Sequence, residues 1–146
     1  MAVSYVLEHV MKHPSMYFSP VEFDVAAAFI QGFNLAGSGG LLVGFREWLI
    51  VKLGDGNNLT WGALVLRLAF PDAETPRQHL LRSGEQKRAV EFLFGLLQEF
   101  WQERESHGGL RRIYVKYQEW LQHQDWYGPS SPDWIAVEGG SPDALT

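Results

Sequence analysis

Apolar residues between Ala89 and Trp101 repeat at the spacing of an α-helix, over the longest periodic stretch of the chain. They are Ala89, Leu93, Leu96, Leu97, Phe100 and Trp101. Ser83 and Gln86 form a capping-box pattern before this stretch, and Gly108-Gly109 follows it. With a rise of 1.5 Å per residue, about twenty residues span roughly 30 Å, the width of a small domain. The pattern therefore predicts a long central helix.

Two further helices are predicted in the first 40 residues. One covers roughly residues 3 to 12 and ends before Pro14, because the proline ring disfavours helical geometry at the preceding residue. The other begins at residues 19–22, where Ser-Pro-Val-Glu reads as a capping box with proline at the first helical position. Its apolar residues recur at helical spacing until the glycine-rich turn at residues 37–40.

Three more helices are predicted after that turn. The first covers about residues 41–53, and the second is a short helix from Trp61 that is closed by Pro71. Residues 72–82 begin with a polar stretch between two prolines, so we expect a loop or a single helical turn there. The last helix covers residues 110–121, where apolar residues again recur at helical spacing.

The composition of the chain changes after residue 124. Residues 125–146 contain four acids, no lysine or arginine, three prolines and three glycines, so this segment carries −4 of the net charge of −5. We predict an all-α protein in which residues 1–124 form a single compact bundle of about six helices. Residues 125–146 are expected to form an irregular, acidic C-terminal segment rich in proline and glycine.

Composition excludes several functional classes. The excess of acidic residues argues against binding to a phosphate backbone, so nucleic acid is not expected as a partner. The absence of cysteine excludes disulfides, thiolate metal sites and a cysteine nucleophile. No apolar run is long enough to predict a membrane span, and the N-terminus lacks the pattern of a secretion signal. We therefore expect a cytoplasmic, soluble protein.

The sequence contains no arrangement of residues that predicts catalysis or a cofactor. His9 and His13 are one helical turn apart, but the position after His9 is valine where a zinc-protease helix needs its general-base glutamate. Glu99, Glu103 and His107 share a face of the long helix without the Glu-x-x-His spacing of a di-iron bundle. We interpret both groups as structural or solvent-exposed, and predict no catalytic, cofactor-binding or metal-binding residue and no enzyme activity.

The six tryptophans separate into two groups. Those on the apolar faces of predicted helices, which we expect to pack in the core, are Trp48, Trp61, Trp101 and Trp120. Trp126 and Trp134 lie outside the periodic helices, among proline, glycine and acidic residues. Aromatic side chains in such a segment either dock on the protein's own surface or contact a partner. The predicted partner-binding residues are Asp125, Trp126, Asp133, Trp134 and Glu138.

Four short motifs together resemble a known group of proteins. They are His-Pro-Ser-Met-Tyr at 13–17, Ala-Phe-Ile-Gln-Gly-Phe at 28–33, Gly-Phe-Arg-Glu-Trp-Leu at 44–49 and Asn-Leu-Thr-Trp at 58–61. This layout, over about residues 13–70, is similar to small helical bacterial families encoded beside secreted polymorphic toxins and regarded as immunity proteins. His13 stands where those families often have arginine, so no role of that arginine is carried over. The resemblance implies a cytoplasmic protein that blocks a toxin by binding it, without catalysis.

Three functional hypotheses follow from the sequence. The first is a non-enzymatic immunity-type inhibitor that neutralises a cognate protein toxin. Acidic residues of its C-terminal segment would speed the encounter, and aromatic anchors would slow release. The second is a small-molecule-binding protein or enzyme with a pocket between helices, lined by Trp48, Trp61 or Tyr17, with His9 or His13 as the polar group. The third is a structural homodimer, which requires an apolar patch on the domain surface.

Overall fold

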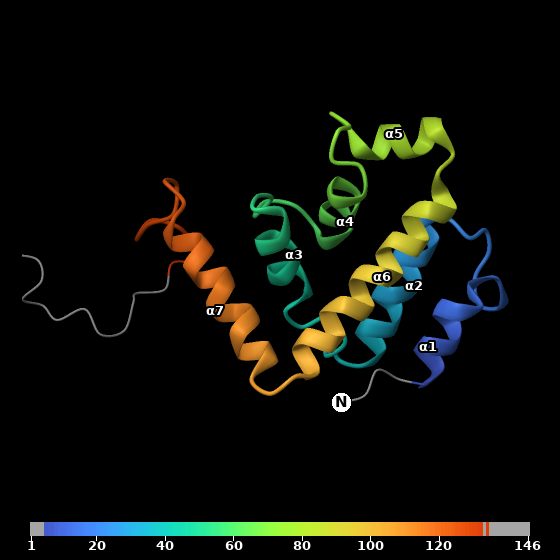
Figure 1. Ribbon diagram of the computed structural model, residues 1–146, viewed down its shortest axis with the longest axis horizontal. Helices are drawn as coiled ribbons and strands as arrows, with labels where there is room; N and C mark the ends of the chain where they lie inside the picture. The colour runs from blue at the N-terminus through green and yellow to red at the C-terminus, as the bar shows by residue number, and fades with distance from the viewer. Residues whose placement is uncertain (1–4, 133, 135–146) are drawn as a thin grey trace, which may run out of the picture.

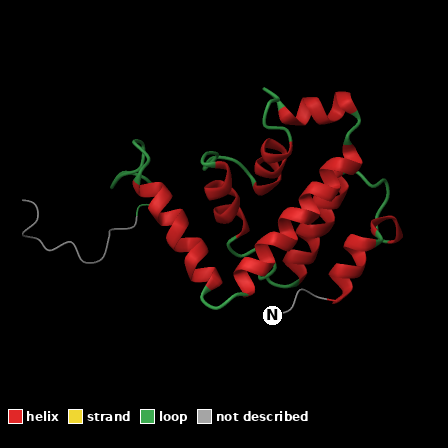
Figure 2. Cartoon of the chain, in the orientation of Figure 1, coloured by secondary structure: helices red, strands yellow, loops and turns green. Residues whose placement is uncertain are grey.

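The computed structural model describes residues 5–132 and residue 134. In this part of the chain, helices are connected by loops and turns, and there is no strand (Figure 2). Within it lie seven α-helices and one 3-10 helix, labelled in Figure 1. Their bounds are α1 Tyr5–Lys12, η1 Pro14–Met16, α2 Phe23–Ala36, α3 Phe45–Leu53, α4 Trp61–Ala69, α5 Pro76–Ser83, α6 Gln86–Glu105 and α7 Gly109–Gln122. The all-α prediction is confirmed. In the described residues, no helix is both long and apolar enough to cross a membrane.

Helix α6 is the centre of the fold, as its periodicity predicts. It contacts α2, α3, α4, α5 and α7, and Figure 1 shows it running along α2 through the middle of the molecule. Its buried side chains are Ala89, Val90, Leu93, Phe94, Leu96, Leu97, Phe100 and Trp101. These positions form an apolar stripe wider than the roughly 100° that a helix on one side of a core needs. Several helices pack on this stripe together.

Helix α2 begins later than the sequence predicts, and its capping box is not formed. Glu22 is the N-cap residue and makes no side-chain hydrogen bond to the helix. The free amide of Phe23 instead donates to Oε1 of Gln86, at 2.9 Å, on the first turn of α6. The prediction from Ser19 and Glu22 is wrong because the acceptor for this helix end comes from a neighbouring helix.

The second predicted capping box, at Ser83 and Gln86, is also wrong. Residues 76–83 form a full helix, α5, so Ser83 is its last residue and Gly84 ends it with φ of +69°. Glu85 is the N-cap residue of α6, without a side-chain cap. A helix therefore replaces the loop or single turn expected here. Burial of Leu80, which is 1% exposed, holds α5 against the core.

The corner between α5 and α6 is closed by polar side chains. Nε2 of His79 lies 3.0 Å from Oε2 of Glu85, and Nη1 of Arg88 donates to Oε1 of the same carboxylate at 3.2 Å. The hydrogen bond with His79, followed by the charge of Arg88, lowers the pKa of the Glu85 carboxyl. The His79 ring also packs on Phe70, the residue that ends α4, with ring centroids 4.7 Å apart.

Helix α3 begins at Phe45 instead of residue 41, because residues 41–44 form a turn. Gly44 is the N-cap residue with φ of +88°, a conformation that favours glycine. Nη1 of Arg104 donates to the carbonyl oxygens of Gly40, Leu41 and Val43. The indole N–H of Trp101 donates to the Leu41 oxygen as well, at 3.1 Å. The end of α6 therefore fixes the place where α3 begins.

The turn between α6 and α7 depends on the absence of a side chain at Gly109. A Cβ atom there would lie 2.0 Å from the Glu103 carbonyl oxygen and 2.6 Å from that of Arg104. These neighbours are backbone atoms of α6, so they cannot move without distorting the end of that helix. Gly108, with φ of +66°, precedes it as the N-cap residue of α7. The Gly108-Gly109 pair thus sets how closely α7 approaches α6.

We expect Gly109→Ala to lower the free energy of unfolding by more than about 2 kcal/mol, because the new methyl group collides with backbone. Gly95→Ala is the matched control: Gly95 lies inside α6 with open space around its Cβ position. Alanine there should raise the free energy of unfolding by roughly 0.5–1 kcal/mol. Urea denaturation of both variants checks this. Equal stability of Gly109→Ala and the parent would contradict the close approach of the two helices.

Candidate partner-binding surface

Helix α7 lies beside α3, and the two helices start at the same end of the molecule (Figure 1). Ile113 and Leu121 are its fully buried large side chains, each 1% exposed. Tyr114 lies at the other edge of this contact, where burial and then the negative charge of Glu47 on α3 raise the pKa of its phenol. The hydroxyl therefore stays protonated and neutral next to that carboxylate. Helix α7 thus contacts both α3 and α6, with Ile113 and Leu121 buried in these contacts.

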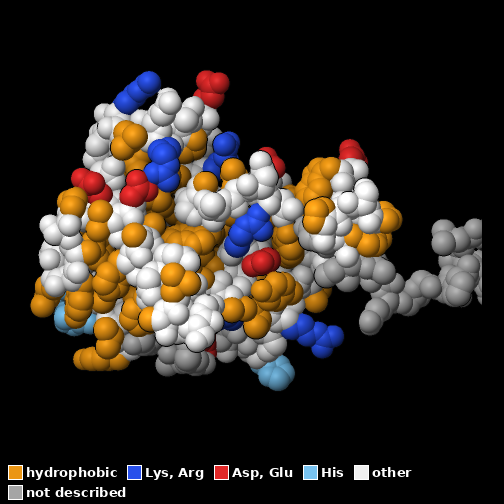
Figure 3. All heavy atoms as spheres, turned by 180° about the vertical axis from the view of Figure 1, so that it is seen from behind, with side chains coloured by type: hydrophobic (Ala, Val, Ile, Leu, Met, Phe, Trp, Pro, Cys, Tyr) orange, Lys and Arg blue, Asp and Glu red, His pale blue; other side chains and the backbone are white. Residues whose placement is uncertain are grey.

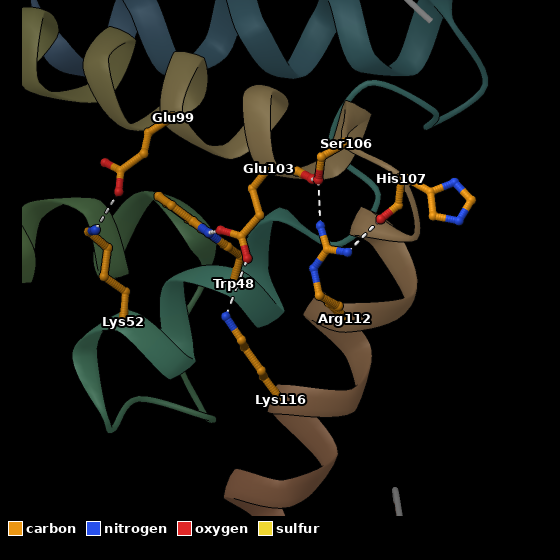
Figure 4. Close-up of polar contacts among 8 residues, drawn as sticks. All are labelled: Trp48, Lys52, Glu99, Glu103, Ser106, His107, Arg112 and Lys116. Carbon is orange, nitrogen blue, oxygen red and sulfur yellow. Dashed lines mark hydrogen bonds and ion pairs between the residues drawn. The ribbon is translucent and has the colours of Figure 1, made fainter.

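Glu103 joins α3, α6 and α7 in a single polar contact (Figure 4). Its Oε2 accepts a hydrogen bond from the indole N–H of Trp48 at 2.7 Å, and its Oε1 lies 3.5 Å from the ammonium group of Lys116. Trp48 is 7% exposed, so its N–H has little access to water and needs this acceptor. One carboxylate on α6 therefore fixes both a buried side chain of α3 and the first half of α7.

A second polar contact closes the turn that leads into α7. The guanidinium of Arg112 donates to the backbone oxygen of His107 and to the hydroxyl oxygen of Ser106 (Figure 4). The Ser106 hydroxyl in turn donates to the Glu103 carbonyl oxygen. The Glu103 oxygen also accepts the Ser106 amide at 3.3 Å, so the serine closes the end of α6 with both its backbone and its side chain. These hydrogen bonds also tie the first turn of α7 to the last turn of α6.

The far half of α7 is held by the loop that follows α3. The hydroxyl of Tyr117 donates to Oδ1 of Asn57, and the guanidinium of Arg46 donates to the backbone oxygens of Asn57 and Leu59. Arg46 therefore shapes residues 54–60, and Tyr117 is bound to that shaped loop. Beyond Tyr117, the end of α7 and the segment after it project from the body, with hydrophobic side chains on their surface (Figure 3).

Five aromatic side chains form a continuous row on this projecting part, which we call the aromatic cluster: Tyr117, Trp120, Trp126, Tyr127 and Trp134. Neighbouring ring centroids along this row lie 6.2, 6.1, 6.1 and 5.2 Å apart. Such separations are typical of favourable aromatic pairs. Tyr127 is the buried member, and its hydroxyl accepts a hydrogen bond from Nε2 of Gln118 at 3.2 Å. The cluster therefore fastens residues 125–132 and 134 to the end of α7.

The structure places three of the predicted partner-binding residues at or near this cluster. Trp126 is 53% exposed, although its ring contacts Trp120 and Tyr127. Asp125 is exposed beside it, and Trp134 is half-buried against Tyr127. The other two predicted residues, Asp133 and Glu138, lie outside the described residues. Of the two alternatives for the C-terminal tryptophans, docking on the protein's own surface applies to Trp134. Trp126 stays largely exposed to solvent.

Trp120 and Glu103, on or near this surface, can be compared with the positions that the sequence predicts for them. Trp120 lies on the apolar side of its helix, which predicts core packing, and the structure shows it half-buried with one side on the Trp126 ring. For Glu103 the sequence predicts a structural or solvent-exposed position, and the structure shows a structural one, in contact with Trp48 and Lys116. The core packing predicted for Trp48 and Trp101 is confirmed, since both are buried, and Trp61 is half-buried.

Of the aromatic residues named for the pocket of the second hypothesis, Tyr17 lies with the histidines, whereas Trp48 lies elsewhere. His9 contacts His13 and Tyr17, on α1 and the segment after η1. Trp48 instead contacts Phe45, Phe100 and Glu103. Figure 1 shows α1 and α3 on opposite sides of α6. The histidines and this tryptophan therefore do not line one pocket. The hollow beside Trp48 holds about 140 Å³, between α3, α6 and α7.

We expect Glu103→Ala to lower the free energy of unfolding by roughly 1–3 kcal/mol, because it leaves the indole N–H of Trp48 without an acceptor. Glu99→Ala is the matched control one turn earlier on α6. Glu99 pairs with Lys52 at 2.9 Å, but their side chains are 55% and 37% exposed, so the change should stay within about 0.5 kcal/mol. Urea denaturation measures both. Similar losses in the two variants would contradict the role given to Glu103.

Comparison of the chain with protein-family models, with curated proteins and with solved structures finds no match.

Proposed function

We propose that this protein is a non-enzymatic inhibitor of the immunity type, which neutralises a toxin by binding it through the aromatic cluster. The observation that carries this proposal is the state of Trp126, an exposed tryptophan on a well-supported turn. Tryptophan is enriched among the residues that dominate the energy of protein interfaces. An exposed indole held in one position is suited to fill a pocket on a partner.

Hydrogen bonds hold the turn that presents Trp126. The amide of Tyr127 donates to the Gln124 oxygen at 3.2 Å, and the amide of Gly128 donates to the Ser131 hydroxyl oxygen at 3.0 Å. That hydroxyl donates to the Trp126 carbonyl oxygen at 3.3 Å. A turn ordered before binding loses less conformational entropy when the complex forms. This preorganisation supports a role of the turn in tight binding.

Charge favours a basic partner for this surface. Residues 125–146 contain four acids and no lysine or arginine, and Asp125 is exposed next to Trp126. An acidic segment attracts a basic protein over a distance of about 10 Å at moderate salt, and this steering raises the association rate. Toxins that bind nucleic acid carry such basic surfaces. The acidic segment would then raise the association rate, and the exposed indole would lower the dissociation rate.

The toxin-inhibitor class is supported by the motifs at residues 13–17, 28–33, 44–49 and 58–61, which resemble bacterial immunity families. A protein of this class acts in the cytoplasm of the cell that makes the toxin, and its function needs no catalytic group. A helical bundle with an exposed tryptophan on a projecting segment is compatible with such a role (Figure 3). The homodimer of the third hypothesis remains an alternative occupant of the same surface.

The proposal is tested with the product of a toxin gene that lies next to the gene for this chain. We expect co-expression of the chain to restore growth of cells that make this toxin, and the two purified proteins to bind in isothermal titration calorimetry. Trp126→Ala should weaken binding by about 30-fold, the loss expected at an interface hot spot of about 2 kcal/mol. Its circular dichroism spectrum should match that of the parent.

Tyr5→Ala is the control, because Tyr5 is 83% exposed on α1, far from the aromatic cluster. Its affinity for the toxin should stay within about twofold of the parent. Failure of the parent to protect cells or to bind would overturn the inhibitor proposal. Unchanged affinity of Trp126→Ala would overturn the assignment of the surface. A dimer of the isolated chain that dissociates in Trp126→Ala would assign the cluster to self-association instead.

A further inference from the structure

At the end of the molecule opposite the aromatic cluster, two histidines and a tyrosine lie together near the surface. His9 is in the last turn of α1, and the amide of His13, one turn later, donates to the His9 carbonyl oxygen at 2.9 Å. The Tyr17 hydroxyl forms a hydrogen bond with Nδ1 of His9. We infer that His9 and His13 bind a divalent transition metal ion, with Tyr17 positioning the His9 ring. This inference is independent of the proposed inhibitor function.

The separation of the two imidazole rings fits a shared metal ion. Their centroids lie 4.9 Å apart, and the ring planes are tilted by 49°. Zinc binds histidine nitrogen at about 2.0 Å with tetrahedral angles, and these values place two imidazole centroids roughly 5 Å apart. The rings of His9 and His13 are therefore already at the spacing that one bound ion requires.

Tyr17 explains how His9 is kept ready to act as a ligand. When Nδ1–H of His9 donates to the Tyr17 oxygen, Nε2 retains its lone pair and can bind a metal. Histidine ligands usually have such an oxygen partner on their second nitrogen. The two rings meet edge to face, 5.6 Å apart, and Tyr17 also packs on Phe29 of α2 at 6.5 Å. Tyr17 is thus itself held in place by α2.

The location of His9 and His13 at the C-terminal end of α1 favours the binding of a cation. The carbonyl groups at the C-terminal end of a helix carry partial negative charge, and His9 and His13 lie at that end. The charged neighbours Glu8 and Lys12 line a hollow between α1 and α6 with Gln98, on a different face of α1. Figure 3 shows histidine side chains at the surface on this side of the molecule, next to hydrophobic side chains. An ion can therefore reach the pair from solvent.

The ligand set indicates which ions fit. Two imidazole nitrogens suit Zn²⁺, Ni²⁺ and Cu²⁺, whereas Mg²⁺ and Ca²⁺ require oxygen ligands. Among the described residues, no group of three histidine, aspartate or glutamate side chains gathers around one point. The ion would therefore keep water molecules in its remaining positions. The pair is expected to bind an exchangeable ion, in contrast to a closed structural zinc site.

The experiment is a calorimetric titration of the full chain with ZnCl₂ in a buffer that does not chelate metal. We expect one ion per chain and a rise in the melting temperature, because the ion binds the folded state. The double variant His9→Ala/His13→Ala should lose both effects. Tyr17→Phe should keep one ion per chain but weaken Zn²⁺ binding by roughly tenfold, the usual cost of losing a partner of a ligand histidine.

His107→Ala is the matched control, because His107 is an exposed histidine on the turn between α6 and α7, outside α1. It should bind Zn²⁺ as the parent does. Unchanged Zn²⁺ binding in the double variant would overturn the site. Equal affinity of Tyr17→Phe and the parent would overturn the positioning role of Tyr17. Circular dichroism of each variant without metal confirms that the fold is intact, so that a loss of binding reports on the ligands.

Discussion

Burial of the broad apolar stripe of α6 is the constraint on which the rest of the structure depends. A helix with eight buried side chains cannot be covered by a single neighbour, so α2, α3, α4 and α5 pack on it together. Its last turns also determine local structure elsewhere. Phe100 packs on Phe45 with centroids 5.1 Å apart, and Trp101 and Arg104 bind the carbonyl groups of the turn before α3. The position of α3 is thus set by one end of α6.

Helix α7 is attached by a different balance of forces. It contributes only two fully buried large side chains, Ile113 and Leu121, so apolar burial alone fixes it weakly. The ion pair between Glu103 and Lys116 and the hydrogen bonds of Arg112 and Tyr117 add to its attachment. Hydrogen bonds are directional, whereas apolar contact is not. The polar contacts therefore determine the angle at which α7 leaves the bundle, and with it the position of the aromatic cluster.

The sequence predicted the helices well, because apolar periodicity reports directly which side of a helix is buried. It failed at the helix ends. The amide at the start of α2 is capped by Gln86, 63 residues away in the chain, and no local pattern at Ser19 or Glu22 could reveal this. Helix α5 was missed because its sequence is polar, and the burial of Leu80 that stabilises it depends on the tertiary fold. Local patterns cannot identify partners that only the packed structure brings close.

The candidate surface was predictable to the extent that its residues are unusual for their place in the sequence. Trp126 and Trp134 stand out because large aromatic residues follow the last helix among prolines and acids, where no core position is available. The sequence could not show which of the two tryptophans is exposed, since exposure depends on how the rings pack around Tyr127. In the structure Trp134 packs on Tyr127, and Tyr127 packs on the end of α7. Trp126 contacts both Trp120 and Tyr127, and it is still 53% exposed. The same two contacts hold the exposed indole against the end of α7 and the turn that follows it.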